Sequence, residues 1–337
     1  MSFGRMMNPL LGLGAILMLH RVGPRVAGGF APNDTLVVTP QWLERLIRTV
    51  LARGDRFVSL AELHDAVAPG QAPAGGAQEA QAARRSPRRY VLTFDDGYVD
   101  NFELAYPILK KHGVPFTIYL ATSFPDRQAI LWWYALEARI RDCTDLPLAS
   151  GQVLPCRTAA ERQAAFMAVR HDIMHQPGLS GQAAYEKVMG SAGDVDWAAL
   201  CAAHALDWSQ VRTLADDPLV TIGSHTITHP VLAELSETAA YDEIAGSRQA
   251  IEQQIGRPVE HFCYPFGGVA EAGAREFQLA ARAGYKTATT TRFGNVFPMH
   301  GRHLHALPRV YVHEGYTAGG YLKQSARHWL SRRLGRS

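Results

Sequence analysis

The strongest constraint on the fold is a repeated alternation of short apolar runs with segments of helical apolar spacing. The apolar runs fall at residues 15–20, 90–94, 114–120, 219–225, 261–267, 285–290 and 307–312. The helical segments between them fall at residues 39–54, 101–113, 237–255 and 268–283. Repeated strand–helix units require parallel strands covered by helices, so the sequence predicts an α/β fold on a parallel sheet or barrel.

Two internal segments interrupt this alternation. Residues 123–217 are predicted to be a helical insertion, which in a barrel usually lies over the functional face. Residues 68–89 are rich in Ala, Gly, Gln, Pro and Arg without an apolar period, which predicts a flexible surface loop. We therefore expect one domain over residues 1–337 that carries these two additions.

The two ends of the chain carry apolar residues beside basic ones. The run NPLLGLGAILML is too short to span a bilayer and is followed by no small-residue cleavage site, so we expect a buried strand over residues 15–20 rather than a signal or anchor. Residues 316–337 have the pattern of a basic amphipathic helix, which can lie on an anionic membrane; a surface helix or a frayed tail is the other interpretation.

Composition excludes some classes of protein and indicates a compartment. The formal net charge of +3 is too small for a general nucleic-acid binder, so no nucleic-acid partner is expected. The four cysteines show no CxxC spacing and are expected to be free thiols of a reducing compartment. Together these features predict a cytoplasmic protein, which the tail can associate with the inner membrane.

Two polar motifs follow predicted strands that are far apart in the sequence. TFDDG places Asp95 and Asp96 after an apolar run, and HTITHP places His225 and His229 after another. The histidine spacing fits one turn of helix, so both imidazoles can face one point and form a two-histidine, one-carboxylate site for a divalent ion. We expect Asp96 to complete the site and Asp95 to act as general base on a bound water, whereas the alternative is that both aspartates cap the next helix.

These motifs resemble those of the polysaccharide deacetylase family, the NodB-homology carbohydrate esterases, and matching features run from about residue 15 to 312. The resemblance implies a distorted (β/α) barrel of about seven strands. It also implies a divalent metal, with zinc as the expected ion, held by Asp96, His225 and His229. The implied reaction removes acetyl from an N-acetylated sugar.

The third motif of that family corresponds to CYPFG in this sequence. By this resemblance the backbone N–H of Phe266 stabilises the oxyanion, and Tyr264, Pro265 and Gly267 belong to the substrate-binding loop. Cys263 stands where the family has the arginine that orients the base. Arg309 is the candidate replacement, with a structural ion pair as its alternative role.

The general acid is missing from its usual place near the C-terminus of the family. The first predicted strand ends in His20, much as the next ends in Asp95, so we expect His20 to protonate the departing amine. The chain would then resemble a circular permutation of the family order, with His20 near the metal on the side opposite Asp95. His305 and His313 are the alternatives.

The expected substrate is an N-acetylhexosamine in a lipopolysaccharide, capsule or exopolysaccharide intermediate, including a lipid-linked glycan. Trp132 and Trp133 are expected either to stack on the sugar or to form the core of the insertion. Two other functions stay open: an O-acetyl esterase, and a glycan-binding protein that has lost catalysis.

Overall fold

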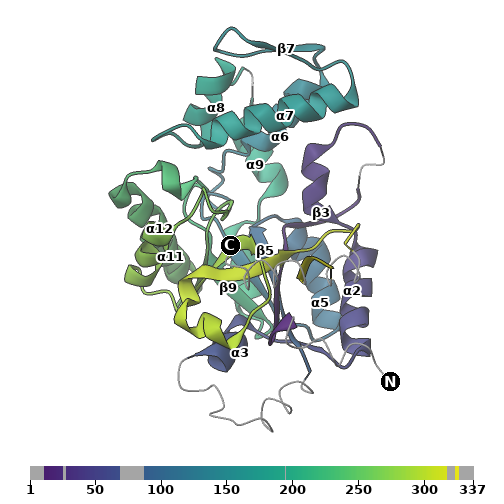
Figure 1. Ribbon diagram of the computed structural model, residues 1–337, viewed down its shortest axis with the longest axis vertical. Helices are drawn as coiled ribbons and strands as arrows, with labels where there is room; N and C mark the ends of the chain where they lie inside the picture. The colour runs from purple at the N-terminus through teal and green to yellow at the C-terminus, as the bar shows by residue number, and fades with distance from the viewer. Residues whose placement is uncertain (1–10, 26–27, 69–86, 194, 317–322, 326–337) are drawn as a thin grey trace.

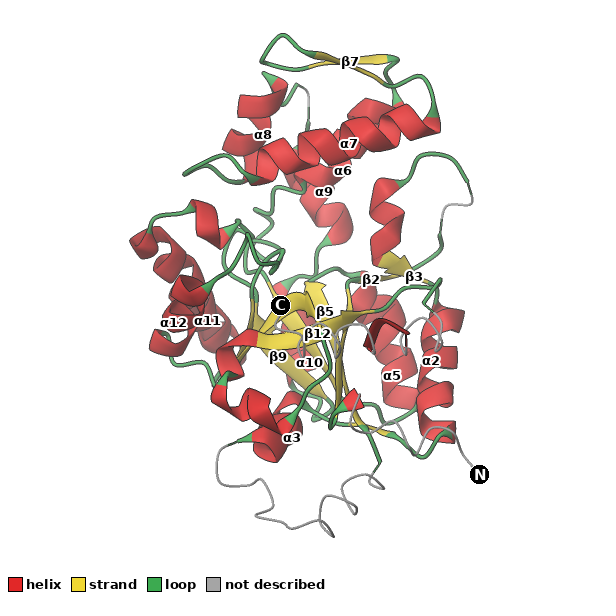
Figure 2. Cartoon of the chain, in the orientation of Figure 1, coloured by secondary structure: helices red, strands yellow, loops and turns green. Residues whose placement is uncertain are grey.

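The computed structural model describes residues 11–25, 28–68, 87–193, 195–316 and 323–325, and its centre is a closed barrel of seven parallel strands (Figures 1 and 2). These strands are β1 (Gly14–Leu19), β5 (Arg89–Asp96), β6 (Phe116–Leu120), β9 (Val220–Ser224), β10 (His261–Cys263), β11 (Thr287–Phe293) and β12 (Leu307–Tyr311). Around the ring they follow chain order, and β1 pairs with both β5 and β12. The predicted (β/α) barrel is confirmed. Because the ring is closed, its strand order alone does not show which strand comes first in other members of the family. The circular permutation therefore stays a prediction.

The ring is irregular, as the term "distorted" implies. β9 and β10 share a single register pair, Phe262 with Ser224, and the register of β11 against β12 shifts between Thr289 and Phe293. Three further pairings lie outside the ring and are made by short strands. They are β4 (Arg56–Phe57) on β5, β2 (Arg21–Val22) on β3 (Val37–Val38), and β7 (Asp145–Pro147) on β8 (Val153–Pro155).

Helices cover the outside of the barrel and pack their apolar faces on it. They are α2 (Pro40–Ala52), α3 (Leu60–Val67), α5 (Tyr106–Lys111), α10 (Trp208–Ala215), α11 (Glu237–Ile255) and α12 (Ala274–Arg282). Local sequence sets their ends: Thr39 accepts a hydrogen bond from the Trp42 N–H at the start of α2, and Gly256 ends α11 in the left-handed region. Short turns of other helix types are η2 (Pro32–Leu36), η3 (Asn101–Ala105), η4 (Leu232–Glu234), η5 (Pro298–Arg302) and η6 (Leu304–Ala306).

Three predicted boundaries need correction. The helix expected over 101–113 begins as the π-helical turn η3 and becomes α-helical only at Tyr106. The helix expected from residue 268 begins at Ala274, and residues 268–273 form a loop before it. β5 starts at Arg89, inside the segment predicted to be a loop, and residues 69–86 of that segment lie outside the described residues.

The insertion after β6 forms a separate layer, drawn in teal at the top of Figure 1. It contains α6 (Trp132–Arg141), the β7–β8 hairpin, α7 (Ala159–Met174), α8 (Gly181–Met189) and α9 (Trp197–His204). Its buried side chains form their own apolar cluster, distinct from the main barrel core. The prediction of a purely helical insertion over 123–217 missed the hairpin, and α10 packs on the barrel core instead.

The ends of the chain add little to this description. Among the described residues no helix combines the length and apolar character needed to cross a membrane. Most of the predicted C-terminal helix lies outside the described residues, so the membrane contact stays a prediction. The predicted first strand lies in the barrel one residue earlier than expected, as β1.

Candidate active site

Both aspartates of TFDDG lie at the end of β5 and line the same cavity. A regular strand would point neighbouring side chains to opposite faces. Here Asp96 adopts φ +78° and Gly97 φ +106°, which turns the chain so that both carboxylates face inward. Gly97 is required, because a Cβ at this position would lie 2.5 Å from Leu120 Cδ1.

Asp95 is held by a buried bidentate ion pair with Arg309, which comes from β12. Its two carboxylate oxygens each lie 2.7 Å from a guanidinium nitrogen, and Arg309 is 0% exposed. Arg309 also donates to the carbonyl of Thr290 and the Sγ of Cys263. Burial raises the pKa of Asp95, but the charge and hydrogen bonds of Arg309 outweigh burial and leave that pKa lowered. Asp95 is therefore an oriented, ionised carboxylate.

The carboxylate of Asp96 faces the two histidines of HTITHP. Its Oδ1 lies 3.3 Å from His225 Nε2 and 3.2 Å from His229 Nε2, and the three ligand atoms all fall within 4.8 Å of one another. Burial raises the pKa of Asp96, but the charge of His229 and the close approach of both imidazoles leave it well below its usual range. The site thus gathers one carboxylate and two imidazoles at one point.

The expectation that His225 and His229 lie one helical turn apart is wrong. They lie in a loop after β9, and the positive φ of Thr226 (+72°) and His229 (+60°) turns the second imidazole back toward the first. The loop is fixed by Glu243, which accepts hydrogen bonds from the N–H groups of Ile227 and Thr228. Strained left-handed residues of this kind persist where the surrounding structure enforces them, often at functional sites.

The residues present fit a divalent ion. The Nδ1 of His225 lies 2.7 Å from the carbonyl of Cys263, so that N–H is committed and Nε2 is free to present its lone pair. Asp96 Oδ1 is buried and makes no hydrogen bond of good geometry with any described group. Two imidazole nitrogens and a carboxylate oxygen are a common donor set for zinc and similar metals.

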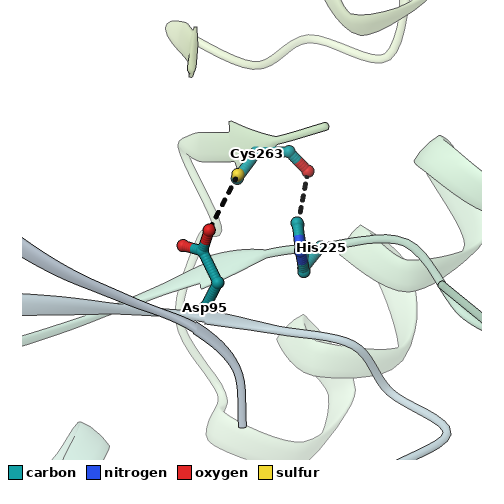
Figure 3. Close-up of side chains that lie close together, drawn as sticks. All are labelled: Asp95, His225 and Cys263. Carbon is teal, nitrogen blue, oxygen red and sulfur yellow. Dashed lines mark hydrogen bonds between the residues drawn. The ribbon is translucent and has the colours of Figure 1, made fainter. Parts of the chain in front are cut away.

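A second group of potential ligands lies nearby, made of Asp95, His225 and Cys263 (Figure 3). Cys263 contacts both partners, through Sγ with Asp95 and through its carbonyl with His225. Arg309 already contacts both oxygens of Asp95 and lies 3.0 Å from Cys263 Sγ. A cation at this group would meet the guanidinium, so the group containing Asp96 is the better metal site.

The CYPFG loop turns at Phe266, which adopts φ +59°. The Thr291 hydroxyl donates to the Phe266 carbonyl at 2.5 Å, and the Thr291 N–H donates to the Gly267 carbonyl. No described group accepts a hydrogen bond from the Phe266 N–H. Phe266 lines the cavity and its N–H has no acceptor among the described residues, so its role at an oxyanion stays a prediction.

The other predicted residues of this loop do not line the cavity. Tyr264 is fully buried in the barrel core, where its hydroxyl donates to the carbonyl of His305. Pro265 and Gly267 are buried in the turn, and a Cβ on Gly267 would lie 2.9 Å from two backbone atoms. The expectation that these three residues contact substrate is corrected: they shape the loop that presents Phe266.

His20 follows β1 and lies beside Asp95, not opposite it. Register pairs Leu19 with Phe94, and His20 Nε2 lies 3.9 Å from Asp95 Oδ2. The expectation of opposite sides is wrong because β1 and β5 are neighbours in the closed ring. Burial lowers the pKa of His20, and its Nδ1 has no hydrogen-bond partner among the described residues.

Comparison with known proteins identifies the family. A sequence model described as polysaccharide deacetylase matches residues 82–288. This chain belongs to the polysaccharide deacetylase family. It is also similar to the Bacillus subtilis (strain 168) protein YxkH, which carries a polysaccharide deacetylase name, at 22% identity over 241 residues. That match covers 72% of this chain but only 57% of the relative.

Solved structures share the fold of this deacetylase at low sequence identity. The Streptococcus pyogenes deacetylase PplD, solved in complex with acetate, aligns with a TM-score of 0.57 and 18% identity over 92% of this chain and 96% of that one. IcaB from Ammonifex degensii aligns with a TM-score of 0.54 and 18% identity over 94% and 97% of the two chains. The shared family and fold are those of polysaccharide deacetylases, which are generally metal-dependent.

The deacetylase cavity has a volume of about 440 Å³ and lies between the strand ends and the insertion. Trp132 and Trp133 line it and are buried in the insertion core, so their core role is confirmed and stacking on a sugar stays a prediction. Trp133 Nε1 donates to the Tyr98 hydroxyl, and its ring lies 5.7 Å from that of His229.

Several cavity residues had no signal in the sequence. They are Met18, Asn33, Tyr98, Phe166, Met167, Arg170, Thr291 and Tyr311. Tyr98, next to TFDDG, could have been found from its position after a strand end. The residues of α7 could not, because a helix on the surface carries arginines and methionines for many reasons.

Proposed function

We propose that the chain is a metal-dependent N-deacetylase that removes acetyl from an N-acetylhexosamine of a bacterial lipopolysaccharide, capsule or exopolysaccharide intermediate. One observation carries the proposal. The ligand atoms of Asp96, His225 and His229 lie within 4.8 Å of one another, beside a separate carboxylate that Arg309 keeps ionised. Two adjacent aspartates thus have different partners, as ligand and base require.

Asp96, His225 and His229 would hold the ion, for which zinc is the expected choice and other divalent metals are alternatives. When bound, such an ion lowers the pKa of a water molecule and polarises a carbonyl. The chain's own residues then carry the reaction. Asp95 takes a proton from the attacking water while the oxygen of that water bonds to the acetyl carbon. The Phe266 N–H donates to the acetyl carbonyl oxygen, which becomes negative in this step.

Collapse of the tetrahedral species breaks the C–N bond, and the departing nitrogen needs a proton. We assign this role to His20, which lines the cavity with its Nε2 3.9 Å from Asp95 Oδ2. A proton taken by Asp95 therefore has a short route to His20. The products are acetic acid, which ionises to acetate, and a free amine. Once the proton has been delivered, Asp95 and His20 have returned to their starting protonation states.

The place of action belongs to the same proposal. A cytoplasmic enzyme that meets a lipid-linked or nucleotide-linked glycan at the inner membrane agrees with the free thiols of the four cysteines. The basic tail would then approach the membrane surface. Equilibrium binding of the full chain to anionic vesicles, with and without residues 317–337, tests this part.

The decisive experiment is acetate release from a panel of lipid-linked and nucleotide-linked N-acetyl sugars. We expect release that a chelator abolishes and zinc restores. An O-acetylated panel run in parallel tests the esterase alternative, since an alcohol leaves with less help from an acid than an amine does. Metal bound without release from either panel would favour the glycan-binding alternative and refute the proposal.

A further inference from the structure

Arg170, on insertion helix α7, lines the cavity without a partner for its charge. Neither a hydrogen bond nor an ion pair joins its guanidinium to any other residue in the described part of the chain. The group lies over the Phe266 ring, 5.7 Å from its centroid, and the Phe266 ring in turn lies 4.9 Å from that of His229. Arg170 therefore stands one aromatic ring away from the metal-ligand loop.

The charges around the cavity set Arg170 apart. Among the described residues that line it, formal charge is carried only by Asp95, Asp96 and Arg170, apart from the histidines. Asp95 is neutralised by Arg309, and Asp96 faces two imidazoles. Burial lowers the pKa of Arg170 and the negative charge of Glu271 partly offsets this shift, but no salt bridge joins the two side chains. Apart from the histidines, Arg170 is therefore the one cationic side chain among the described residues of the wall, and no carboxylate pairs with it.

The environment of Arg170 suits a ligand better than solvent. Burial lowers the pKa of its guanidinium, which reflects the cost of removing the charge from water. A guanidinium that rests on an aromatic ring keeps its N–H donors at its edge, where they match two oxygens of a phosphate or carboxylate. The guanidinium of Arg170 is a planar, half-buried cation at the wall of an open cavity. These are the features of an anion-binding site.

We propose that Arg170 binds an anionic group, a phosphate or a carboxylate, borne by the glycan next to the acetylated sugar. The inference rests on the proposed deacetylase function and narrows its substrate to a charged glycan. The barrel supplies the reacting groups, and α7 selects a substrate whose charge reaches the insertion. A neutral sugar of the same shape gains nothing from this contact.

The test uses the zinc-loaded full chain and three soluble probes. They are N-acetylglucosamine 1-phosphate, methyl N-acetylglucosaminide, and a methyl disaccharide in which N-acetylglucosamine neighbours a glucuronate. The measured quantity is the ratio of kcat/KM on each charged probe to kcat/KM on the neutral one. Arg170→Ala should lower at least one ratio by about ten- to a hundredfold, the scale of a charged hydrogen bond, and Arg170→Lys should lower it less.

Arg139→Ala is the matched control, since Arg139 lies on insertion helix α6, is half-buried like Arg170 and does not line the cavity. It should leave both ratios as in the wild type. The phosphate and uronate probes distinguish the two anions, and a loss on either one supports the site. If Arg170→Ala lowers charged and neutral probes equally, Arg170 only positions Phe266 and the proposal is overturned.

A binding measurement separates this inference from the deacetylase function. Calorimetric titration with inorganic diphosphate should give a Kd that rises about tenfold or more in Arg170→Ala but not in Arg139→Ala. If no probe releases acetate while this difference persists, the anion site stands and the deacetylase proposal fails on these sugars. If acetate is released normally and neither Kd nor ratio depends on Arg170, the anion site fails and the deacetylase function stands.

Discussion

The barrel and the exposed part of insertion helix α7 line the same cavity, but their side chains are held in place to different degrees. The barrel residues are locked: Asp95 is 2% exposed, and Arg309 is 0% exposed and holds it through two hydrogen bonds. The α7 residues are freer, since Met167 is 49% exposed and Arg170 makes no ion pair with any described residue. This difference suggests that the barrel determines the chemical step and the insertion determines which glycan is accepted. Substitutions in the two regions should therefore separate kcat from KM.

The largest effect is expected from the metal ligands. His225→Ala and His229→Ala each remove one of three donors, so zinc content and acetate release should fall together to background. Metal analysis and the acetate assay on the same preparation check this. His171→Ala, an exposed histidine of α7, is the control and should keep both. A variant that keeps full zinc but has no activity would mean that its imidazole is not a ligand.

Asp95→Asn should separate catalysis from metal binding within the barrel. Because Asp95 pairs with Arg309 and not with His225 or His229, the variant should retain zinc. Its kcat should fall by about a hundredfold or more, the range for a general base. Asp96→Asn should lose the metal instead. Equal zinc loss in both variants would refute the assignment of the two aspartates.

Arg309→Met should destabilise the barrel and disorient the base. Removing one partner of a buried ion pair leaves Asp95 unpaired and costs about 3–5 kcal/mol, measured by denaturant unfolding. Adding Cys263→Arg in the same chain should recover part of this loss, because Cys263 Sγ lies 3.8 Å from Asp95 Oδ2 and faces the space that Arg309 leaves. A double variant no more stable than Arg309→Met would show that an arginine at position 263 cannot replace the guanidinium of Arg309 as the partner of Asp95.

His20→Ala should lower kcat for an N-acetyl sugar by about a hundredfold while metal and fold are kept. The loss on an O-acetyl sugar should be smaller, since the leaving alcohol depends less on an acid. His313→Ala serves as the control. Full activity of His20→Ala would return the search for the acid to His305 and His313, although His305 Nε2 already contacts the carbonyl of Tyr285.

The smallest effect is expected from the exposed rim of the insertion. Met167→Gln should raise KM a few-fold with kcat unchanged, because the side chain touches the cavity but no catalytic group. Val153→Gln provides a matched control: it is 56% exposed, lies on the β7–β8 hairpin and does not line the cavity. A change in kcat for Met167→Gln would break the proposed division between barrel and insertion.

The sequence alone was sufficient for the elements and the donor residues. Apolar periodicity predicted the seven barrel strands and four of the helices that cover them, α2, α5, α11 and α12, because the burial of one face is visible in the local spacing of apolar residues. TFDDG and HTITHP supplied the ligand types, and the strand end at His20 suggested a group on the same face. Their closeness followed from the fold class, because parallel strands end on one side of a barrel.

Tertiary structure alone decided the geometry of the site. Four of the five described non-glycine residues with positive φ are Asp96, Thr226, His229 and Phe266. Packing around them holds conformations that local preference disfavours, so no sequence period could reveal them. The family resemblance made Arg309 a candidate, but only the closed barrel shows that it reaches Asp95 across 214 positions. Arg170 had no signal in the sequence. Their roles depend on which surfaces the closed barrel and the insertion bring face to face, and no local pattern in the sequence encodes that contact.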